Sequence, residues 1–406
     1  MELAIVPPLR RPLRPECAPD PLRDRLAEHV EASVLEMLDP DRIEALAEDM
    51  RIIERKRVHH GGLVVCAFIL SALERSTDTE GRLLDARMVY QEIGGPESGK
   101  TSFRNMAHKM LPVMKELLRR RLRQLEQCAE PPELRGRLRS FSDVLVPDGC
   151  AFKLASALSG VYAGTGQAAE MKLHAVYSVR AGTAVSVTST AGSVHDSDGF
   201  WPERWEKEAL YLWDLAFNSH ERFLDATLAG AHVLQRLKES ANPTVLASYG
   251  PTGTRRELHA DDGRPMRLDD ACAFGLVHHQ TVLELDVQIS DGRGRTTQAR
   301  VVCVPHNGED RYYLTTLSRD IFTPHDVAEL YRLRWEVELF FRNWKGGVRL
   351  DHVRFLSHPW SLQLAVTASL LAALMLSGIH AGLARIAQSA AEPIAQDAAE
   401  PAAITP

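Results

Sequence analysis

The sequence predicts an α/β protein in which a mixed-sheet domain is interrupted by a β-rich insertion and preceded by an all-helical region. Three observations predict this fold class. Residues 22 to about 128 carry apolar side chains at helical spacing, with no convincing alternation, and a Pro- and Gly-containing linker follows. From residue 140 onward, short runs rich in β-branched residues are separated by helical segments, as in mixed α/β domains. Within that part of the chain, residues 239–305 are dominated by alternating, strand-like segments.

Length and composition limit the possible classes of protein. With 406 residues, the chain is too long for one ordinary domain and suggests two or three. Apolar residues make up 45% and charged residues 25%, which is typical of a soluble globular protein. Because the net charge is −6, any contact with nucleic acid must come from local basic patches. None of the six cysteines forms a CxxC pair, so we expect neither a zinc site nor a disulfide framework, but a reduced, cytosolic protein.

The N-terminal region begins with a Pro- and Arg-rich segment, residues 1–21, that is expected to be disordered and makes a poor signal peptide. Residues 22–139 are expected to form a helical, DNA-binding domain. Gly94 to Arg139 contains eleven Lys and Arg against five Asp and Glu, a local balance of +6 that suits phosphate binding. A solvated basic helix explains the same charges equally well.

Residues 140–238 are expected to form the first part of the mixed-sheet domain. SDVLVPDG is a short β-branched run that ends at Asp148, and ALYLWD is an apolar run that ends at Asp214. Between them, MKLHAVYSVRAG and TAVSVTSTAG predict a strand pair that turns near Ala181 and Gly182. SHERFLDATLAG then predicts a helix, and AHVLQRLK predicts a further strand.

After the insertion of residues 239–305, the chain returns to the mixed-sheet domain. Residues 306–386 are expected to form its second part, with a long helix from Thr323–Pro324 to Lys345. The later run LQLAVTASLLAALMLSGI is long enough to raise the question of a membrane span, but its Gln, Thr and Ser side chains favour a buried core helix. Residues 387–406 are low in complexity and expected to be disordered.

The long helix aligns four polar side chains, those of Tyr331, Arg334, Glu338 and Lys345. Relative to the first, the other three point at roughly −60°, −20° and −40°, since each residue turns the helix by about 100°. The four therefore line one narrow stripe beside an apolar face. A solvated helix flank with an Arg334–Glu338 pair four residues apart would give the same spacing.

Spelled out, this stretch is YRLRWEVELFFRNWK, and it matches the Y-x2-R-x3-E-x6-K signature of a large group of bacterial insertion-sequence transposases with a DDE triad. The chain resembles that group over roughly residues 140–360. The segments around Asp148 and Asp214 are similar to those around the group's two aspartates, and the β-rich segment matches its insertion domain. SVHDSDGF, with His195 and Asp196, resembles the loop after the family's hairpin. His195, with Asp196 and Asp198, could reach the metal region or cap the loop.

The resemblance implies a ribonuclease-H-like fold and a triad of Asp148, Asp214 and Glu338 that holds two Mg²⁺ or Mn²⁺ ions. It implies metal-dependent cleavage and strand transfer of DNA, the chemistry of cut-and-paste transposition of an insertion sequence. Clustered carboxylates repel one another unless cations neutralise them, and hard divalent ions with oxygen ligands suit that role. The residues implied to bind DNA phosphates are Tyr331, Arg334, Lys345 and Arg236.

The chain departs from the family pattern at three places. Gly149 and Cys150 follow Asp148, where the family often has a hydroxyl residue. Leu215 begins the segment after the second aspartate, where a Gly–aromatic pair is commoner. No Trp lies between Trp213 and Trp335, so the insertion lacks the Trp that some members use to stack on a flipped base.

The expected partner is double-stranded DNA, namely the terminal inverted repeats of a transposon and its target. Pairing two DNA ends implies a homodimer in the synaptic complex, and no membrane partner is expected. The expected location is the bacterial cytoplasm, in association with the nucleoid. Two alternatives stay open: a non-catalytic DNA-binding descendant of a transposase, and a P-loop NTPase, because Gly94–Thr101 (GGPESGKT) fits G-x4-G-K-[ST]. The residues before that motif look helical, whereas a P-loop follows a buried strand.

Overall fold

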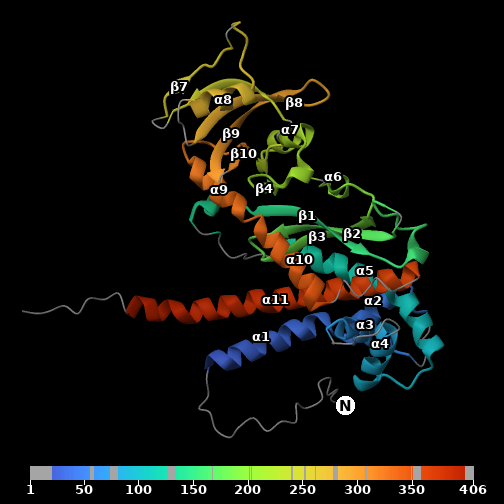
Figure 1. The fold of residues 1–406 in the computed structure, drawn as a ribbon. Helices are drawn as coiled ribbons and strands as arrows, with labels where there is room; N and C mark the ends of the chain where they lie inside the picture. The colour runs from blue at the N-terminus through green and yellow to red at the C-terminus, as the bar shows by residue number, and fades with distance from the viewer. Residues whose placement is uncertain are drawn as a thin grey trace, which may run out of the picture. The chain divides into compact units, whose positions relative to one another are not determined.

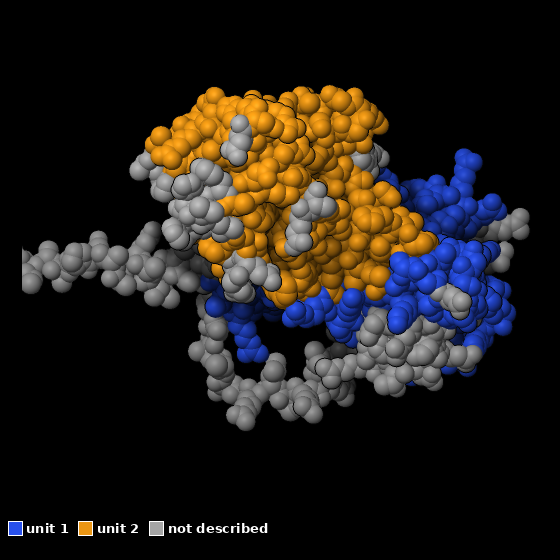
Figure 2. Space-filling view, turned by 45° about the horizontal axis from the view of Figure 1, so that its top comes forward, with its two compact units in different colours: residues 1–127, 152–171, 342–406 blue, residues 128–151, 172–341 orange. Residues whose placement is uncertain are grey.

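The computed structural model of the protein describes residues 21–54, 59–73, 81–126, 134, 136–166, 168–200, 202, 204–238, 241–250, 253–260, 262–277, 282–306, 309–348, 350 and 358–397. The chain divides into two compact units (Figure 2). Unit 1 contains residues 1–127, 152–171 and 342–406, and unit 2 contains residues 128–151 and 172–341. The predicted disordered segment 1–21 lies outside the described residues except for Pro21.

Unit 1 is built mainly from helices, in agreement with the helical pattern of the sequence. They are α1 (Pro21–Met37), α2 (Pro40–Asp49), α3 (Gly61–Ser71), α4 (Gly81–Glu92), α5 (Lys100–Glu126) and α11 (Pro359–Asp397). The start of α2 follows from local chemistry, because the Asp39 side chain accepts hydrogen bonds from the backbone of Asp41 and Arg42, and Pro40 opens the helix. The apolar helix α3 lies almost entirely in the core.

α11 is the longest helix of the chain's described part, and α1 and α5 lie along it (Figure 1). Its segment Pro359–Ala384 is long and apolar enough to cross a membrane, but 72% of its most apolar stretch is buried within the protein. That burial matches the predicted core helix. α11 continues to Asp397, so the prediction of disorder from residue 387 is wrong for residues 387–397. Alanine has the highest helix propensity, and the Ala-rich composition that looked structureless favours helix here.

Ten strands form one mixed sheet in the order β3-β2-β1-β4-β5-β10-β9-β8-β6-β7 (Figure 1). The first five are β1 (Val144–Lys153), β2 (Glu170–Ser178), β3 (Thr183–Ala191), β4 (Leu210–Trp213) and β5 (His232–Arg236). β1 pairs parallel with β4, and β4 pairs parallel with β5. The predicted turn between β2 and β3 is confirmed, with Gly182 at a φ of +64°. β1 runs past Asp148, where the sequence predicted that the strand would end.

The strands of the insertion extend this same sheet. They are β6 (Thr244–Tyr249), β7 (Arg255–Arg256), β8 (Leu283–Ser290) and β9 (Thr296–His306), and β10 (Glu309–Thr315) joins them to β5 by antiparallel pairing. The alternation predicted for β8 is confirmed by its burial. The insertion also contains α8 (Leu268–Val277), a helix that the strand-like pattern did not predict. Two acidic residues in its first turn, Asp269 and Asp270, favour a helix start there.

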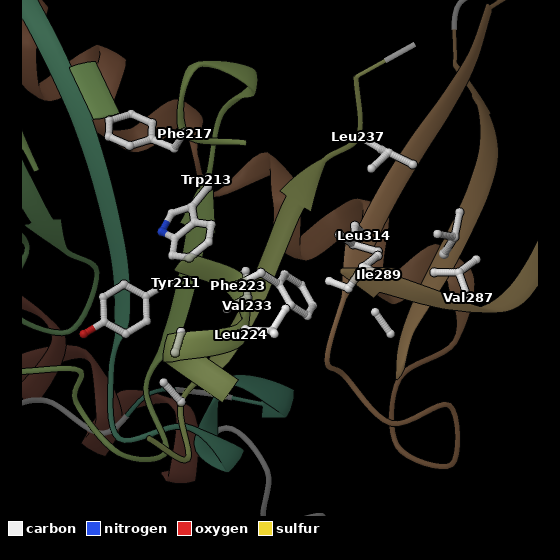
Figure 3. Close-up of a cluster of buried hydrophobic side chains, with 14 of the residues drawn as sticks. Tyr211, Trp213, Phe217, Phe223, Leu224, Val233, Leu237, Val287, Ile289 and Leu314 are labelled. Carbon is white, nitrogen blue, oxygen red and sulfur yellow. The ribbon is translucent and has the colours of Figure 1, made fainter. Parts of the chain in front are cut away.

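A single apolar core spans β4, β5 and the insertion strands (Figure 3). Trp213 of β4 is almost fully buried beside Trp205, with ring centroids 5.7 Å apart. The helix α7 (His220–Leu228) begins at Ser219, whose side chain accepts from the backbone N–H of Arg222, and it buries Phe223 in this core. Because the core is shared, the insertion and the first part of the sheet belong to one unit.

The predicted long helix is two helices, α9 (Pro324–Arg332) and α10 (Trp335–Gly347). α9 begins as predicted, with a capping box formed by Thr323 and Asp326. At the junction, the backbone N–H groups of Leu333 and Arg334 bond to carbonyls three residues earlier, so the chain tightens into a turn. The single continuous stripe predicted for residues 331–345 is therefore wrong, and Arg334 lies at the break.

Candidate active site

Asp148 and Asp214 lie at corresponding positions on two adjacent parallel strands. β1 pairs with β4 in a register that sets Val144 opposite Leu210 and Leu145 opposite Tyr211. Continued along both strands, this register brings Asp148 beside Asp214, on the same side of the sheet. Burial raises the pKa of Asp148, and the negative charge of Asp214 adds to that rise, which agrees with their closeness.

The carboxyl of Asp148 is held in a partly buried position. Its Oδ1 accepts a hydrogen bond from the backbone N–H of Gly149 at 2.8 Å. Burial, together with the negative charges of Asp214 and Asp196, raises its pKa from 3.8 to about 6, against the lowering effects of that N–H and of Arg334. A carboxyl with this pKa is poised to bind a cation, because a nearby positive charge would restore its ionised form.

Asp214 stands at the end of β4 and caps the short helical turn Leu215–Phe217. Its Oδ1 accepts from the backbone N–H of Leu215 at 2.7 Å. Phe217 at the end of the turn is buried and packs against Phe200, with ring centroids 6.0 Å apart. The segment that departs from the family pattern after the second aspartate thus anchors this carboxylate to the core.

Glu338 on α10 is linked to Asp148 through Arg334. The Arg334 guanidinium forms a close ion pair with Glu338, and its Nη1 lies 3.9 Å from Oδ2 of Asp148. Burial alone would lower the pKa of Arg334, but the nearby Tyr331, Asp214 and Glu338 side chains outweigh burial and raise it. The Arg334 side chain is only 17% exposed. A solvated helix flank therefore does not describe this pair, because the arginine reaches the carboxylates of the sheet.

Tyr331 and Arg236 complete this group of side chains in unit 2. Tyr331 is buried and packs on Tyr313, with ring centroids 5.0 Å apart. Burial, followed by the charge of Asp214, raises the pKa of its hydroxyl, and the charges of Arg334 and Arg236 act in the opposite direction. Within the described residues, that hydroxyl has no hydrogen-bond partner.

Lys345, the remaining residue of the predicted signature, belongs to unit 1. It is exposed near the end of α10, with Nζ 5.6 Å from the centre of the Phe152 ring. Six of the predicted site residues therefore lie together in unit 2: Asp148, Asp214, Glu338, Arg334, Tyr331 and Arg236. The contacts of Lys345 are described only within unit 1.

The loop that the sequence singled out, SVHDSDGF, has two roles in the structure. His195 caps the one-turn helix α6 (Asp196–Gly199), because its Nδ1 accepts from the backbone N–H of Ser197 at 3.3 Å. Asp196 is close enough to Asp148 to raise its pKa. The sequence did not point to Lys172, which pairs with Asp196 at 3.1 Å. Only its place in the predicted strand segment MKLH could have suggested that Lys172 lies near the site.

The carboxylates offer the oxygen donors that a hard divalent cation prefers. Among the described residues, no three His, Cys, Asp or Glu side chains converge closely enough to hold a metal ion as they stand. The cation at this position is the guanidinium of Arg334, which contacts Glu338 and neighbours Asp148. Burial, with the added charges of Asp214 and Asp196, raises the pKa of Asp148, and a divalent ion would offset both effects, so the residues fit such an ion in donor type and in charge.

The P-loop alternative lacks its structural context. The residues before Gly94 form α4, a helix, where a P-loop requires a buried strand. Gly95 packs against the ring of Tyr90, where a Cβ would lie 2.5 Å from the ring carbons, so the glycine lets the chain fold closely back onto α4. Lys100 is the first residue of α5.

Sequence comparisons with known proteins agree on one class. Residues 140–375 match the family model described as "Transposase DDE domain". Over 359 residues, the chain is 22% identical to the transposase for insertion sequence element IS231F of Bacillus thuringiensis subsp. israelensis, covering 78% of this chain and 72% of the relative. Over 66 residues, it is 38% identical to a putative transposase, InsL, for insertion sequence element IS186A of Escherichia coli (strain K12), covering 16% and 18%. Among solved structures, a piggyBac transposase synaptic complex with hairpin DNA aligns with a TM-score of 0.40 and 9% identity, over 93% of this chain and 83% of that one.

Proposed function

Because the family match spans residues 140–375, this chain belongs to the DDE transposase family, and we propose that Asp148, Asp214 and Glu338 are its catalytic triad. The chain is thus an enzyme that cleaves and transfers DNA strands, with insertion-sequence transposases among its relatives. Within this family, we assign it to the group with the Y-x2-R-x3-E-x6-K signature, on the residues Tyr331, Arg334, Glu338 and Lys345.

One observation carries the assignment: aspartates at equivalent positions of two parallel strands are joined to a glutamate by a shared arginine. The strand order β3-β2-β1-β4-β5, with β1, β4 and β5 parallel, supports a ribonuclease-H-like catalytic domain. In that fold the aspartates come from the first and fourth strands, and the glutamate comes from a later helix. β1, β4 and α10 supply them here.

Members of this family normally use divalent metal ions. Asp148, Asp214 and Glu338 would hold Mg²⁺ or Mn²⁺, most simply as two ions. When bound, such ions activate an attacking oxygen and stabilise the leaving oxygen of an in-line displacement at phosphorus. We propose cut-and-paste transposition, in which water first frees a 3′-OH and that 3′-OH then attacks the target strand.

The remaining side chains of the site would bind and orient the DNA backbone. Arg334 exchanges its carboxylate partners for a phosphate near the scissile bond, and its planar guanidinium suits two phosphate oxygens. The unpartnered hydroxyl of Tyr331 donates to a phosphate oxygen. Arg236 and Lys345 supply further positive charge to the backbone, Lys345 as a point charge.

The N-terminal helices are the proposed site for the ends of the transposon. Parts of the basic run in α5 are already paired, since Glu116 binds both Arg119 and Arg120, and Arg121 binds Glu36. The surplus of positive charge in this region still suits sequence-independent phosphate contacts. We propose double-stranded DNA as the partner, a homodimer in the synaptic complex, no membrane association, and action in the bacterial cytoplasm at the nucleoid.

The test is cleavage of DNA that carries the element's own ends, with Mg²⁺ or Mn²⁺ and without ATP. The wild type should nick and join strands, and Glu338→Gln should bind DNA but do neither. Glu336→Gln is the matched control, because Glu336 is exposed on the same helix. This variant should cleave DNA at the wild-type rate. If Glu338→Gln and wild type cut equally, the triad is misassigned. If neither cuts and both bind DNA equally, a non-catalytic DNA-binding role replaces the proposal.

A further inference from the structure

An ion pair outside the proposed triad lies against the backbone that follows Asp148. Lys172 on β2 has its Nζ 3.1 Å from Oδ1 of Asp196, the first residue of α6. The same Nζ donates to the carbonyl of Val194 at 2.9 Å. Strand β2 therefore holds the loop between β3 and α6 at two points. The pair is partly shielded from water, since the two side chains are 13% and 29% exposed.

Asp196 in turn packs against Gly149. A Cβ on Gly149 would lie 2.2 Å from Oδ1 of Asp196 and 3.5 Å from Cδ of Lys172. The φ of Gly149 is not in the left-handed region, so the close approach of the aspartate, not the backbone conformation, requires a glycine here. This explains why the chain departs from the family pattern directly after its first aspartate.

Gly149 is also the residue that holds the catalytic carboxyl, because its N–H donates to Oδ1 of Asp148. A continuous chain of contacts thus runs from Lys172 through Asp196 and Gly149 to Asp148. The ring of His174 on β2 packs directly against Gly199, the last residue of the same short helix. A Cβ on Gly199 would lie only 2.1 Å from this ring.

We propose that Asp196, fixed by Lys172, is a positioning residue for Asp148. It sets the position of Gly149 and thereby aims the first carboxylate of the triad at the cation. This inference rests on the proposed function, because it concerns the same site. Residues that orient metal ligands typically change metal affinity or activity by about 10- to 100-fold when they are replaced.

If Asp196 were instead a fourth carboxylate ligand, Lys172→Met would have the opposite effect on cation binding. If Asp196 were a ligand, removing the ammonium group that competes for it would leave cation binding unchanged or make it tighter. If Asp196 acts through its ion pair, the same change releases both Asp196 and Gly149 and weakens cation binding. Lys172→Met therefore separates the two roles.

The experiment is a titration of the full chain with Mn²⁺, followed by electron paramagnetic resonance of the free ion. The variants are Asp196→Asn, Lys172→Met, their double variant and Asp198→Asn, together with Glu338→Gln, which tests the proposed triad itself. Asp198 is the matched control, because it lies on the same short helix with a side chain that is 70% exposed. We expect the first two to weaken binding by about 10- to 100-fold, the double variant to be no worse than either, and the control to match the wild type.

DNA cleavage supplies a second readout. Asp196→Asn and Lys172→Met should raise the metal concentration needed for half-maximal cleavage by more than they lower the rate at saturating metal. A purely structural defect would lower the maximal rate by reducing the folded fraction, which circular dichroism measures. If Asp196→Asn does not fold, Lys172→Met decides alone.

Two outcomes overturn the inference in different ways. If Glu338→Gln weakens Mn²⁺ binding while Lys172→Met leaves it unchanged or tighter, the triad stands and the positioning role is wrong. If Glu338→Gln and the wild type bind Mn²⁺ equally well, the proposed function itself fails, and this inference fails with it.

Discussion

Replacing Asp148 with asparagine should stabilise the protein at neutral pH. Burial and the charges of Asp214 and Asp196 raise the pKa of this carboxyl to about 6. A raised pKa means that the folded state favours the neutral form, so ionisation at neutral pH opposes folding. The same crowding that prepares the site for a cation therefore costs stability when no cation is bound.

The magnitude follows from the shift. A rise of about two pKa units corresponds to about 3 kcal/mol at 1.36 kcal/mol per unit. The penalty is absent below the unfolded pKa, where the carboxyl is protonated in both states; it grows as the pH rises and is complete above about pH 6. The Asp148 side chain is 22% exposed, so solvent screens part of this penalty. We therefore expect Asp148→Asn to raise the free energy of unfolding by about 2–3 kcal/mol, or the Tm by roughly 5–10 °C.

The assay is thermal unfolding in the presence of a chelator, for wild type and Asp148→Asn at pH 7.5 and at pH 4.5. The variant should unfold at a higher temperature at pH 7.5, and the difference should shrink at pH 4.5. Added Mg²⁺ should raise the Tm of the wild type but not that of the variant. Asp320→Asn, at an exposed position, should leave the Tm at both pH values and its response to Mg²⁺ as in the wild type. A lower Tm for Asp148→Asn at pH 7.5, or the same gain at both pH values, would refute the reasoning.

Three further changes test the site and the fold. Arg334→Gln removes the guanidinium that lies 3.9 Å from Asp148. The loss of its proposed charge-assisted hydrogen bond to a DNA phosphate, worth about 1.5–3 kcal/mol, should slow single-turnover cleavage by about 10- to 100-fold, and an unchanged rate would remove Arg334 from the site. Thr323→Ala breaks the capping box with Asp326 and should cost about 1 kcal/mol in urea denaturation, whereas an unchanged midpoint would contradict the cap. Phe223→Ala removes a fully buried ring and should cost about 3–5 kcal/mol, so a loss below about 1 kcal/mol would contradict the shared core.

Strands β1 to β5 were predictable in their order along the chain because each has a local signal. A β-branched run leads into Asp148, an apolar run ends at Asp214, and the helix between β4 and β5 has Ser219 as its cap. The start of α9 was equally readable from Thr323 and Pro324. Such features depend on a few neighbouring residues, so the sequence alone predicts them.

Features that depend on tertiary contacts were not predictable. The break before α10 has no Gly or Pro to mark it, and it places Arg334 3.9 Å from the carboxylate of Asp148, which lies on a distant strand. The requirement for Gly149 comes from Asp196, which is distant in sequence. The pairing of β10 with β5, which joins the insertion to the sheet, likewise has no local signal.

Single-turnover cleavage of DNA bearing the element's own ends tests the central claim most directly, with the variants Asp148→Asn, Asp214→Asn, Glu338→Gln and the triple variant compared in Mg²⁺. Because the three carboxylates act as one unit, each single variant should fall to the level of the triple variant. If any single variant keeps the wild-type rate, or if the triple variant still cleaves, these residues are not the catalytic triad of this transposase.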